Sequence, residues 1–275
     1  MQKTKVLKRI LMCRPTYFDV LYSINPWMKV GSVDKFRASL QWERLVKVYK
    51  NLGIEVLVIE QKKGLPDMVF SVDQNLLHKN TVILSNFRFA QRQGETPLYA
   101  NWFEKNRYDV KSLTKTNFFE GGDCLSWKNV LYVGNGFRTT KKTIKEIASL
   151  FSFTLIPLTL VLPEFYHLDT CLFLLNETTA FYYPRAFDLI SRRMLKKCIP
   201  NLIPLVKKEA YNFAANSVAT DHHVVLQEGN FRFKSQIEQL GYKTVLVDVS
   251  EFMKAGGGIR CLTNVIKENY EALPS

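Results

Sequence analysis

The chain has 275 residues, of which 47% are hydrophobic and 23% charged, and its formal net charge is +13. A chain of this length and composition can bury a large core without disulfides or structural metal ions, which excludes the disordered and the disulfide-dependent classes. Its five cysteines are an odd number and lie far apart in the sequence, so we expect reduced thiols.

No segment has the character of a membrane span or a secretory signal. The apolar run near the N-terminus is interrupted by Arg14 and Pro15. The most apolar stretch, residues 153–165, is too short to cross a bilayer and contains two prolines. No linker-like segment divides the chain. We therefore expect a single domain over residues 1–275, a cytoplasmic location and no membrane partner.

Strand-like and helix-like segments alternate along the chain. Three isolated strands are predicted at residues 6–13, 54–59 and 244–249. Helices are predicted at residues 33–52, 140–150, 186–198 and 231–240, the first with Ser32 as its N-cap and Gly53 after its end. Four hairpins are predicted from strands joined by short polar turns: 68–77 with 81–85, 123–127 with 130–133, 170–175 with 179–183, and 216–221 with 224–227.

A polar residue stands near the start of each hairpin, and a cysteine near the start of the last expected strand. These residues are Asp73, Glu120, His167, Asn216 and Cys261, at steps of 47, 47, 49 and 45 residues. Such spacing is typical of a repeated supersecondary unit, although regular α/β alternation can also produce it. Five units would close into a ring, with strand 6–13 completing the last unit. The five polar residues would then meet near the axis of the ring.

Cys261 and His167 are the residues with the chemistry of a catalyst. Three glycines at 256–258 precede Cys261 and would allow a ligand to approach the backbone closely, but Cys261 could equally be a small buried hydrophobe. If its segment is extended, His167 shares a face with Asp169, which favours a general acid or base. The alternative is a hydrogen-bonded core histidine.

Carboxylates near these residues point to a cationic substrate. Glu120 and Asp123 flank two glycines, and Asp73 stands in an otherwise apolar segment. A buried carboxylate is costly unless it faces a cation, hydrogen-bond donors or water. A cationic substrate would meet that requirement.

A series of short motifs resembles the guanidine-modifying enzymes of the pentein superfamily. This group contains dimethylarginine dimethylaminohydrolase, arginine deiminase, arginine dihydrolase domains and the amidinotransferases. The motifs are MCRP at 12–15, INPWM at 24–28, GLPDMVF at 64–70, RQGE at 92–95, FEGGD at 119–123, GFRT at 136–139, FYHLDT at 165–170, SEF at 250–252 and AGGGIRC at 255–261. The resemblance implies an α/β fold, a five-bladed α/β propeller of ββαβ repeats with pseudo-fivefold symmetry.

The resemblance also implies roles for individual residues. Cys261 would be the nucleophile, His167 the general acid and base, and Glu120 a partner of the guanidinium or of His167. The remaining expected substrate-binding residues are Asp73 and Asp169 for the guanidinium nitrogens, Arg92 and Arg138 for a carboxylate, and Asn25 at the mouth of the site. No metal or organic cofactor is expected. The adjacent His222 and His223 would point to opposite faces of a strand, a poor geometry for sharing one ion.

The predicted reaction is hydrolysis of the guanidinium C–N bond of arginine or an N-methylated arginine. Dihydrolase-type relatives, which release ornithine, carry Asn where this chain has Asp73, so we expect a citrulline-type product. Three alternatives stay open: an amidinotransferase, an arginine dihydrolase, and a non-catalytic basic pentein that binds RNA or a ribosome. The basic residues occur in scattered doublets rather than one long run, which favours a solvated surface over a nucleic-acid site.

Overall fold

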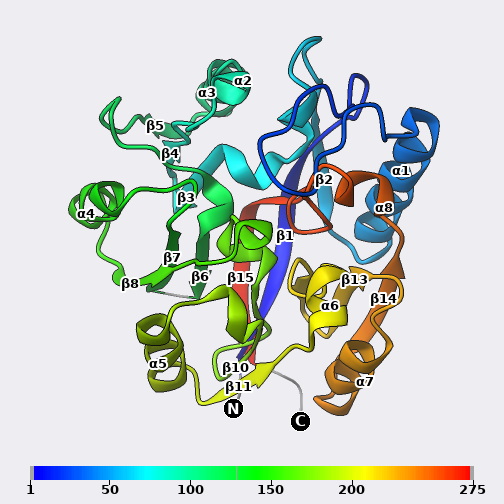
Figure 1. Ribbon diagram of the computed structural model, residues 1–275, viewed down its shortest axis with the longest axis vertical. Coiled ribbons are helices and arrows are strands. Elements are labelled where there is room, and N and C mark those ends of the chain that lie inside the picture. Colours follow the sequence, from blue (N-terminus) through cyan, green and yellow to red (C-terminus); the bar gives the residue numbers. More distant parts are fainter. Residues whose placement is uncertain (1–2, 128, 273–275) are drawn as a thin grey trace.

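The computed structural model describes residues 3–127 and 129–272, with side chains from residue 6 to residue 267. Five three-stranded sheets surround a common centre, and the longer helices lie outside them (Figure 1). In each sheet two strands form an antiparallel pair and a third runs parallel to the middle strand. This arrangement is a five-bladed α/β propeller, as predicted.

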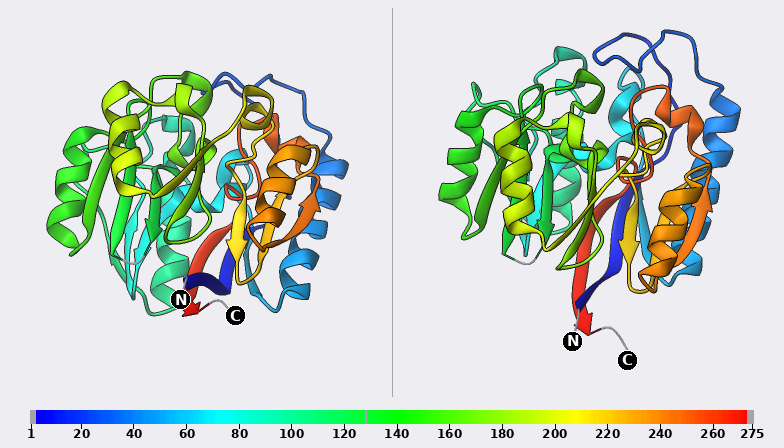
Figure 2. Two further views of the ribbon diagram at one scale, coloured as in Figure 1. Left: turned by 90° about the horizontal axis from the view of Figure 1, so that it is seen from below. Right: turned by 60° about the horizontal axis from the view of Figure 1, so that its bottom comes forward.

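The blades follow one another along the chain, and the last is completed by the N-terminal strand. The first four are β3 (Asn75–His78), β4 (Thr81–Leu84) and β5 (Asp109–Lys111); β6 (Cys124–Trp127), β7 (Val130–Asn135) and β8 (Thr154–Thr159); β9 (Leu172–Leu174), β10 (Thr179–Tyr182) and β11 (Asn201–Pro204); and β12 (Val218–Thr220), β13 (His223–Gln227) and β14 (Lys243–Val247). The fifth combines β15 (Asn264–Ala272), β1 (Lys3–Cys13) and β2 (Glu55–Ile59). The start of β1 therefore lies beside the end of β15, which closes the ring (Figure 2).

A helix leads from the middle strand of each blade to its parallel third strand. These helices are α1 (Lys35–Asn51), α2 (Ala90–Gln93) with α3 (Thr96–Lys105), α4 (Lys141–Leu150), α5 (Leu189–Cys198) and α7 (Phe231–Gln239). Two short helices, α6 (Lys207–Tyr211) and α8 (Ser250–Met253), lie between blades. No described helix is long and apolar enough to cross a membrane.

The local sequence of helix α1 determines its buried face and its two ends. Its buried residues Ala38, Trp42, Leu45 and Tyr49 recur at helical spacing and face the core. Asp34 is the N-cap, and its carboxylate accepts a hydrogen bond from the Arg37 N–H. The predicted Ser32 cap is therefore wrong by two residues, whereas the predicted end before Gly53 is confirmed.

Several predicted boundaries are wrong where a buried apolar segment is a turn rather than a strand. Residues 66–69 and 71–74 form two 3₁₀ turns, so the predicted strand 68–77 is extended only over residues 75–77, and β3 ends one residue later at His78. Residues 168–170 and 184–186 are also 3₁₀ turns, and α5 consequently begins at Leu189. An apolar run alone does not distinguish these turns from buried strands. Lys128, in the second predicted hairpin turn, lies outside the described residues.

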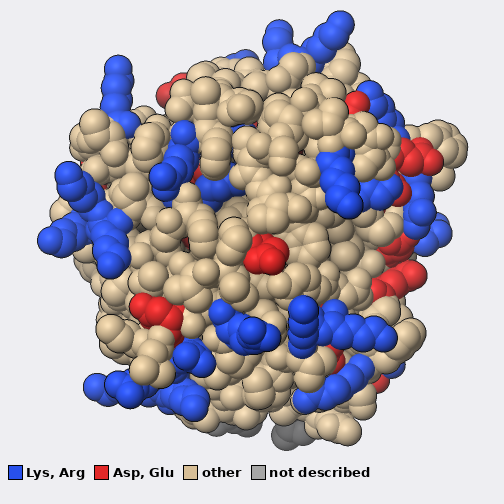
Figure 3. All heavy atoms as spheres, in the orientation of Figure 1, with Lys and Arg blue, Asp and Glu red and all other residues tan. Residues whose placement is uncertain are grey.

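The described basic side chains are spread around the molecule. In the view of Figure 3, Lys and Arg lie mainly towards the rim of the face, in several separate groups. The middle of that face is largely tan, with an acidic group near its centre. The arrangement agrees with the scattered doublets of the sequence.

Candidate active site

The polar residues that recur along the chain meet at the centre of the ring. His167 Nε2 lies 2.9 Å from Glu120 Oε2, and His167 Nδ1 lies 3.3 Å from Asp73 Oδ1. Asn216 Nδ2 lies 3.2 Å from Cys261 Sγ, which is 3.6 Å from Asp169 Oδ2. All are buried. The predicted convergence of the five repeat positions is confirmed.

Short 3₁₀ turns, not extended strands, deliver three of these side chains. Asp73 lies within the turn at residues 71–74, Glu120 directly precedes the turn at 121–123, and His167 directly precedes the turn at 168–170. The expectation that an extended segment places His167 and Asp169 on one face is therefore wrong. His167 contacts Asp73 and Glu120, whereas Asp169 contacts Cys261.

The diglycine at 121–122 allows the close approach of the charged groups. A Cβ atom at Gly122 would lie 2.5 Å from Asp73 Oδ1 and 2.7 Å from His167 Nδ1. A Cβ at Gly121 would meet the backbone carbonyl oxygens of Val72, in the turn that carries Asp73, and of Asn75, directly after it. Glycine is required here because of space, since neither residue has a positive φ.

Glu120 and Asp73 hold His167 in its charged form. Burial by itself would lower the pKa of His167, but the charge of Asp73 and the hydrogen bond with Glu120 raise it to about 9. Burial acts to raise the pKa of Glu120, yet Arg138 and His167 bring it below its ordinary value. His167 is consequently an imidazolium at neutral pH and can donate a proton.

Two buried arginines brace this cluster. Arg92 donates to Asp73 at 2.7 Å, to both carboxylate oxygens of Glu95 at 3.0 and 2.9 Å, and to the Asp67 carbonyl at 3.2 Å. Burial raises the pKa of Glu95 to about 7 against the opposing charge of Arg92. Because several Arg92 donors already have acidic partners, its predicted binding of a substrate carboxylate stays a prediction.

Arg138 lies between two aromatic rings near a small pocket. Its guanidinium carbon is 4.6 Å from the ring centroids of both Phe89 and Tyr166, and it donates to Glu120 at 2.9 Å. A second nitrogen donates to the Ile24 carbonyl at 3.0 Å. This planar clamp leaves Arg138 rigid at the wall of the pocket.

The same pocket contains Asn25 and an acid that sequence reasoning missed. Asn25, Asp67, Arg92 and Arg138 all line it. Asp67 Oδ2 accepts a hydrogen bond from Tyr22 at 2.9 Å, while Oδ1 has no hydrogen-bond partner among the described residues. Its place in the motif at 64–70 was the available signal. A buried oxygen with spare accepting capacity at a pocket wall can bind an ammonium group.

Among the described residues, no hydrogen bond or ion pair joins a cationic side chain to the Cys261 thiol. Burial raises the pKa of the Cys261 thiol well above its ordinary value, and the charges of Asp169 and Asp73 raise it further. Burial also raises the pKa of Asp169 to about 7, and its Oδ1 has no hydrogen-bond partner among the described residues. This side of the site is therefore complementary to a cation.

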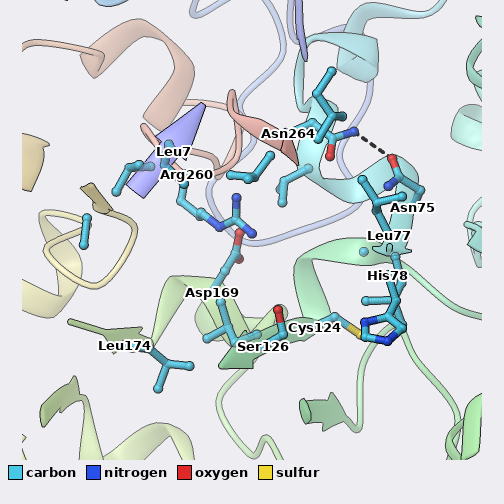
Figure 4. Close-up of a pocket in the computed structure, with 18 of the residues that line it drawn as sticks. Leu7, Asn75, Leu77, His78, Cys124, Ser126, Asp169, Leu174, Arg260 and Asn264 are labelled. Atoms are coloured by element: carbon cyan, nitrogen blue, oxygen red, sulfur yellow. Dashed lines mark hydrogen bonds between the residues drawn. The ribbon is translucent and has the colours of Figure 1, made fainter. Parts of the chain in front are cut away.

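A cavity of about 540 Å³ occupies the centre of the ring and reaches Asp169. Residues from β3, β6, β9, β12 and β15 line it, and the side chains of Asp169 and Arg260 project into it towards one another (Figure 4). Asn264 donates to Asn75 across one wall at 2.7 Å. Within the described part of the chain no group of three or more His, Cys, Asp or Glu side chains has the geometry of a metal site.

Comparison with known proteins identifies the class of this fold and site. Residues 25–267 match the family model for eukaryotic N,N-dimethylarginine dimethylhydrolase. The chain is 37% identical over 264 residues to N(G),N(G)-dimethylarginine dimethylaminohydrolase of Mycobacterium tuberculosis, covering 95% of this chain and 87% of that protein. It is also 37% identical over 271 residues to the bifunctional arginine dihydrolase/ornithine cyclodeaminase AgrE of Nostoc, covering 94% of this chain and 38% of the relative.

A solved structure shows the same fold. The N-terminal domain of ArgZ bound to its product, described as a cyanobacterial arginine dihydrolase, superposes with a TM-score of 0.92 at 36% sequence identity. The match covers 94% of this chain and 97% of that domain. Fold, site and relatives together define a guanidino-group hydrolase of the pentein superfamily. The chain belongs to the dimethylarginine dimethylaminohydrolase family.

Proposed function

We propose that residues 1–275 form one catalytic domain that hydrolyses the guanidinium C–N bond of arginine or an N-methylated arginine to a citrulline-type product. The observation that carries this proposal is the convergence of a buried thiol, an imidazolium and several carboxylates at the ring centre. That set supplies a nucleophile, an acid and a binding site for a delocalised cation without further groups.

The charged groups suggest how the substrate lies. Asp169 and Asp73 would bind guanidinium nitrogens, because both carboxylates are buried. Asp169 Oδ1 has no hydrogen-bond partner among the described residues, and Asp73 Oδ1 faces His167 Nδ1 at 3.3 Å without a closer hydrogen-bond partner among them. Asp67 would accept the α-ammonium group, and Arg138 with Arg92 would bind the α-carboxylate. Asn25, which donates to the Ala255 carbonyl at 3.0 Å, would line the mouth.

Arrival of the substrate would create the nucleophile. A guanidinium beside Cys261 opposes the charges that raise the pKa of the thiol and favours the thiolate. Sγ then bonds to the guanidinium carbon with a thiolate electron pair, and the π electrons of the C=N bond pass to nitrogen in the tetrahedral adduct. His167 donates its proton to the departing nitrogen, the C–N bond breaks, and a covalent thiouronium remains.

Water completes the reaction. Having lost its proton, His167 can accept one from a water molecule whose oxygen attacks the thiouronium carbon. The C–S bond breaks, the thiolate re-forms, and the product is a ureido group. Holding the planar cation between the carboxylates and the thiolate provides the orientation that a weak electrophile needs.

A second candidate function is dihydrolysis to ornithine. It is favoured by the similarity to AgrE and to ArgZ, both of which are described as arginine dihydrolases. It is opposed by Asp73, because the dihydrolase-type relatives carry Asn at the matching position. An amidinotransferase would use the same residues but pass the amidino group to an amine.

The test is product analysis by mass spectrometry after incubation with arginine, monomethylarginine and asymmetric dimethylarginine, with Cys261→Ser as the control. Citrulline from one substrate, absent in the variant, supports the proposal. Ornithine as the main product would favour the dihydrolase. A new guanidino compound formed only when an acceptor amine is added would favour the amidinotransferase. If none of the three compounds reacts, the hydrolase, dihydrolase and amidinotransferase assignments are all contradicted for these small substrates.

A further inference from the structure

Asn216 connects the cysteine loop to the rest of the ring. Its side-chain Oδ1 accepts hydrogen bonds from the N–H groups of Gly258 at 3.0 Å and Cys261 at 3.1 Å. Its backbone carbonyl accepts another from the Arg260 N–H at 3.0 Å. Three N–H groups of residues 258–261 therefore converge on one residue that lies 42 to 45 positions earlier in the chain.

The other end of the same amide faces the thiol. Asn216 Nδ2 donates to Cys261 Sγ at 3.2 Å and to the Asp169 carbonyl at 3.1 Å. With two donors and two acceptor positions used, the amide has reached its full hydrogen-bonding capacity. Turning the amide over would place NH₂ against two N–H groups, so this network determines its orientation.

The absence of a side chain at Gly258 makes room for this contact. A Cβ atom at Gly258 would lie 2.9 Å from Asn216 Oδ1, closer than a carbon and an oxygen can pack without displacement. The last glycine of the run at 256–258 therefore allows the amide to approach the loop. Asn216 itself is 1% exposed, and a hydrogen bond in such a site is stronger than one in water.

The charges around the Cys261 thiol explain why a hydrogen bond from the neutral Asn216 amide is important for forming the thiolate. Asp169 and Asp73 both disfavour a thiolate at Cys261, and the nearby Tyr166 is a neutral phenol. Burial and these two carboxylates raise the pKa of Cys261, while hydrogen bonds from the Gly258 N–H and the Asn216 amide lower it. Arg260 adjoins Cys261 in sequence, but one of its guanidinium nitrogens donates to the Thr263 carbonyl at 2.8 Å.

We infer that Asn216 is a positioning residue for the proposed reaction: it anchors the loop that carries Cys261 and donates a hydrogen bond to the thiolate as it forms. The inference rests on the proposed role of Cys261 as nucleophile. It assigns the fourth repeat position a role in the site, so that all five positions serve the same chemistry.

The test separates the two ends of the amide. Asn216→Asp keeps an oxygen for the Gly258 and Cys261 N–H groups but replaces the donor to Sγ with a second oxygen. Asn216→Ala removes both ends. Alkylation of Cys261 by 2-chloroacetamidine, a small amidinium that loses chloride to the thiolate, would be followed across pH by mass spectrometry of the Cys261 peptide. We expect both variants to react at least about tenfold more slowly at neutral pH, equivalent to about one pKa unit, with the profile displaced to higher pH.

A matched control is Asn176→Asp. Asn176 is also buried, and its Oδ1 accepts from the N–H groups of Thr178 and Thr179 in the turn between β9 and β10. This variant should lose thermal stability without changing the alkylation profile. If Asn216→Asp alkylates as the unmodified chain does, the thiolate-donor role is overturned. If Asn216→Ala also alkylates normally while only its melting temperature falls, the residue has a structural role alone.

This experiment is independent of arginine turnover. A protein that shows the Asn216-dependent alkylation but no reaction with any guanidine would contradict the proposed substrate and leave the inference standing. Hydrolysis of a guanidine by the unmodified chain, together with an unchanged alkylation profile in both variants, would support the proposed substrate and overturn the inference on Asn216. Absence of Cys261 alkylation in the unmodified chain would overturn both the inference and the nucleophile assignment.

Discussion

The two sides of the ring centre differ in how their charges are balanced. On one side His167 lies within ion-pair distance of both Glu120 and Asp73, and Arg92 and Arg138 pair with Asp73 and Glu120 in turn. On the other side Cys261 and Asp169 are buried together, and the pKa of each is raised. The side with His167 is charged before a substrate binds. On the side with Cys261 and Asp169, the positive charge of the substrate favours ionisation of the thiol and the carboxyl group.

This difference in charge balance explains why one site can both bind and attack a cation. If the thiol were permanently ionised by a neighbouring lysine or arginine, that cation would also repel the guanidinium. A neutral thiol beside a carboxylate avoids the repulsion. The ion pairs of His167 with Glu120 and Asp73 keep the imidazole protonated, so that it can donate a proton to the departing amine.

The strongest test of the comparison is Cys261→Ser. Removing the thiolate should lower turnover by roughly 10⁴-fold or more, because a nucleophile acts together with its acid and cannot be replaced by them. Circular dichroism and the melting temperature should stay close to those of the unmodified chain, since the serine fills nearly the same space. A variant that folds and still turns over at a tenth of the normal rate would remove Cys261 from the mechanism.

Asp169→Asn should separate activity from stability. Loss of the carboxylate that faces the guanidinium should reduce turnover by roughly 10²-fold, since a misplaced reacting group has effects of that size. Its raised folded pKa favours the protonated form, so Asp169 stabilises the fold at low pH and costs stability as pH rises through about 7. The variant should therefore melt at a higher temperature than the unmodified chain above pH 7, a difference that shrinks towards pH 4.

An unchanged rate in Asp169→Asn would place the residue outside the guanidinium site. An unchanged rate together with a lower melting temperature would identify it as a buried structural carboxylate. Thermal unfolding and initial rates on the same protein preparations distinguish these outcomes.

Asp73→Asn tests the side on which the charges are already paired. Arg92 would lose its 2.7 Å carboxylate partner and His167 one of its two ion-pair partners. We expect a rate reduction of roughly tenfold, the effect of weakening one charge-assisted contact. We also expect ornithine to appear among the products, because the family resemblance implies Asn at this position in dihydrolase-type proteins. Citrulline as the sole product would show that Asp73 does not determine the extent of hydrolysis.

The smallest expected effect is on the pH dependence of stability. The pKa of His167 is about 9 in the folded chain and near 6.5 when unfolded, so its ion pairs stabilise the fold fully below about pH 6.5. That contribution is lost as pH rises towards 9. The melting temperature of the unmodified chain should therefore exceed that of His167→Asn at pH 6, and the difference should diminish by pH 9. A difference independent of pH would mean that His167 is neutral in the folded protein.

The overall fold and the core of the candidate site could be predicted because both depend on local, repeated information. The helix that ends before Gly53 and the recurrence of Asp73, Glu120 and His167 are properties of the chain itself. Once the repeat closes a ring, equivalent positions must approach the axis. The family-like motifs then associate those positions with guanidine chemistry.

The tertiary structure alone decided how those side chains are paired. Residues 66–74 are apolar enough for a buried strand, and only their packing against the ring makes them 3₁₀ turns. The hydrogen bonds of Asn216 with the Cys261 loop join residues 45 positions apart, and Arg92 reaches Asp73 from a separate helix. The raised pKa of Asp169 and Cys261 follows from burial among particular neighbours. Spacing along the chain can bring residues to one place, but burial and the orientation of each side chain set their charge, and these arise only when all five blades are assembled.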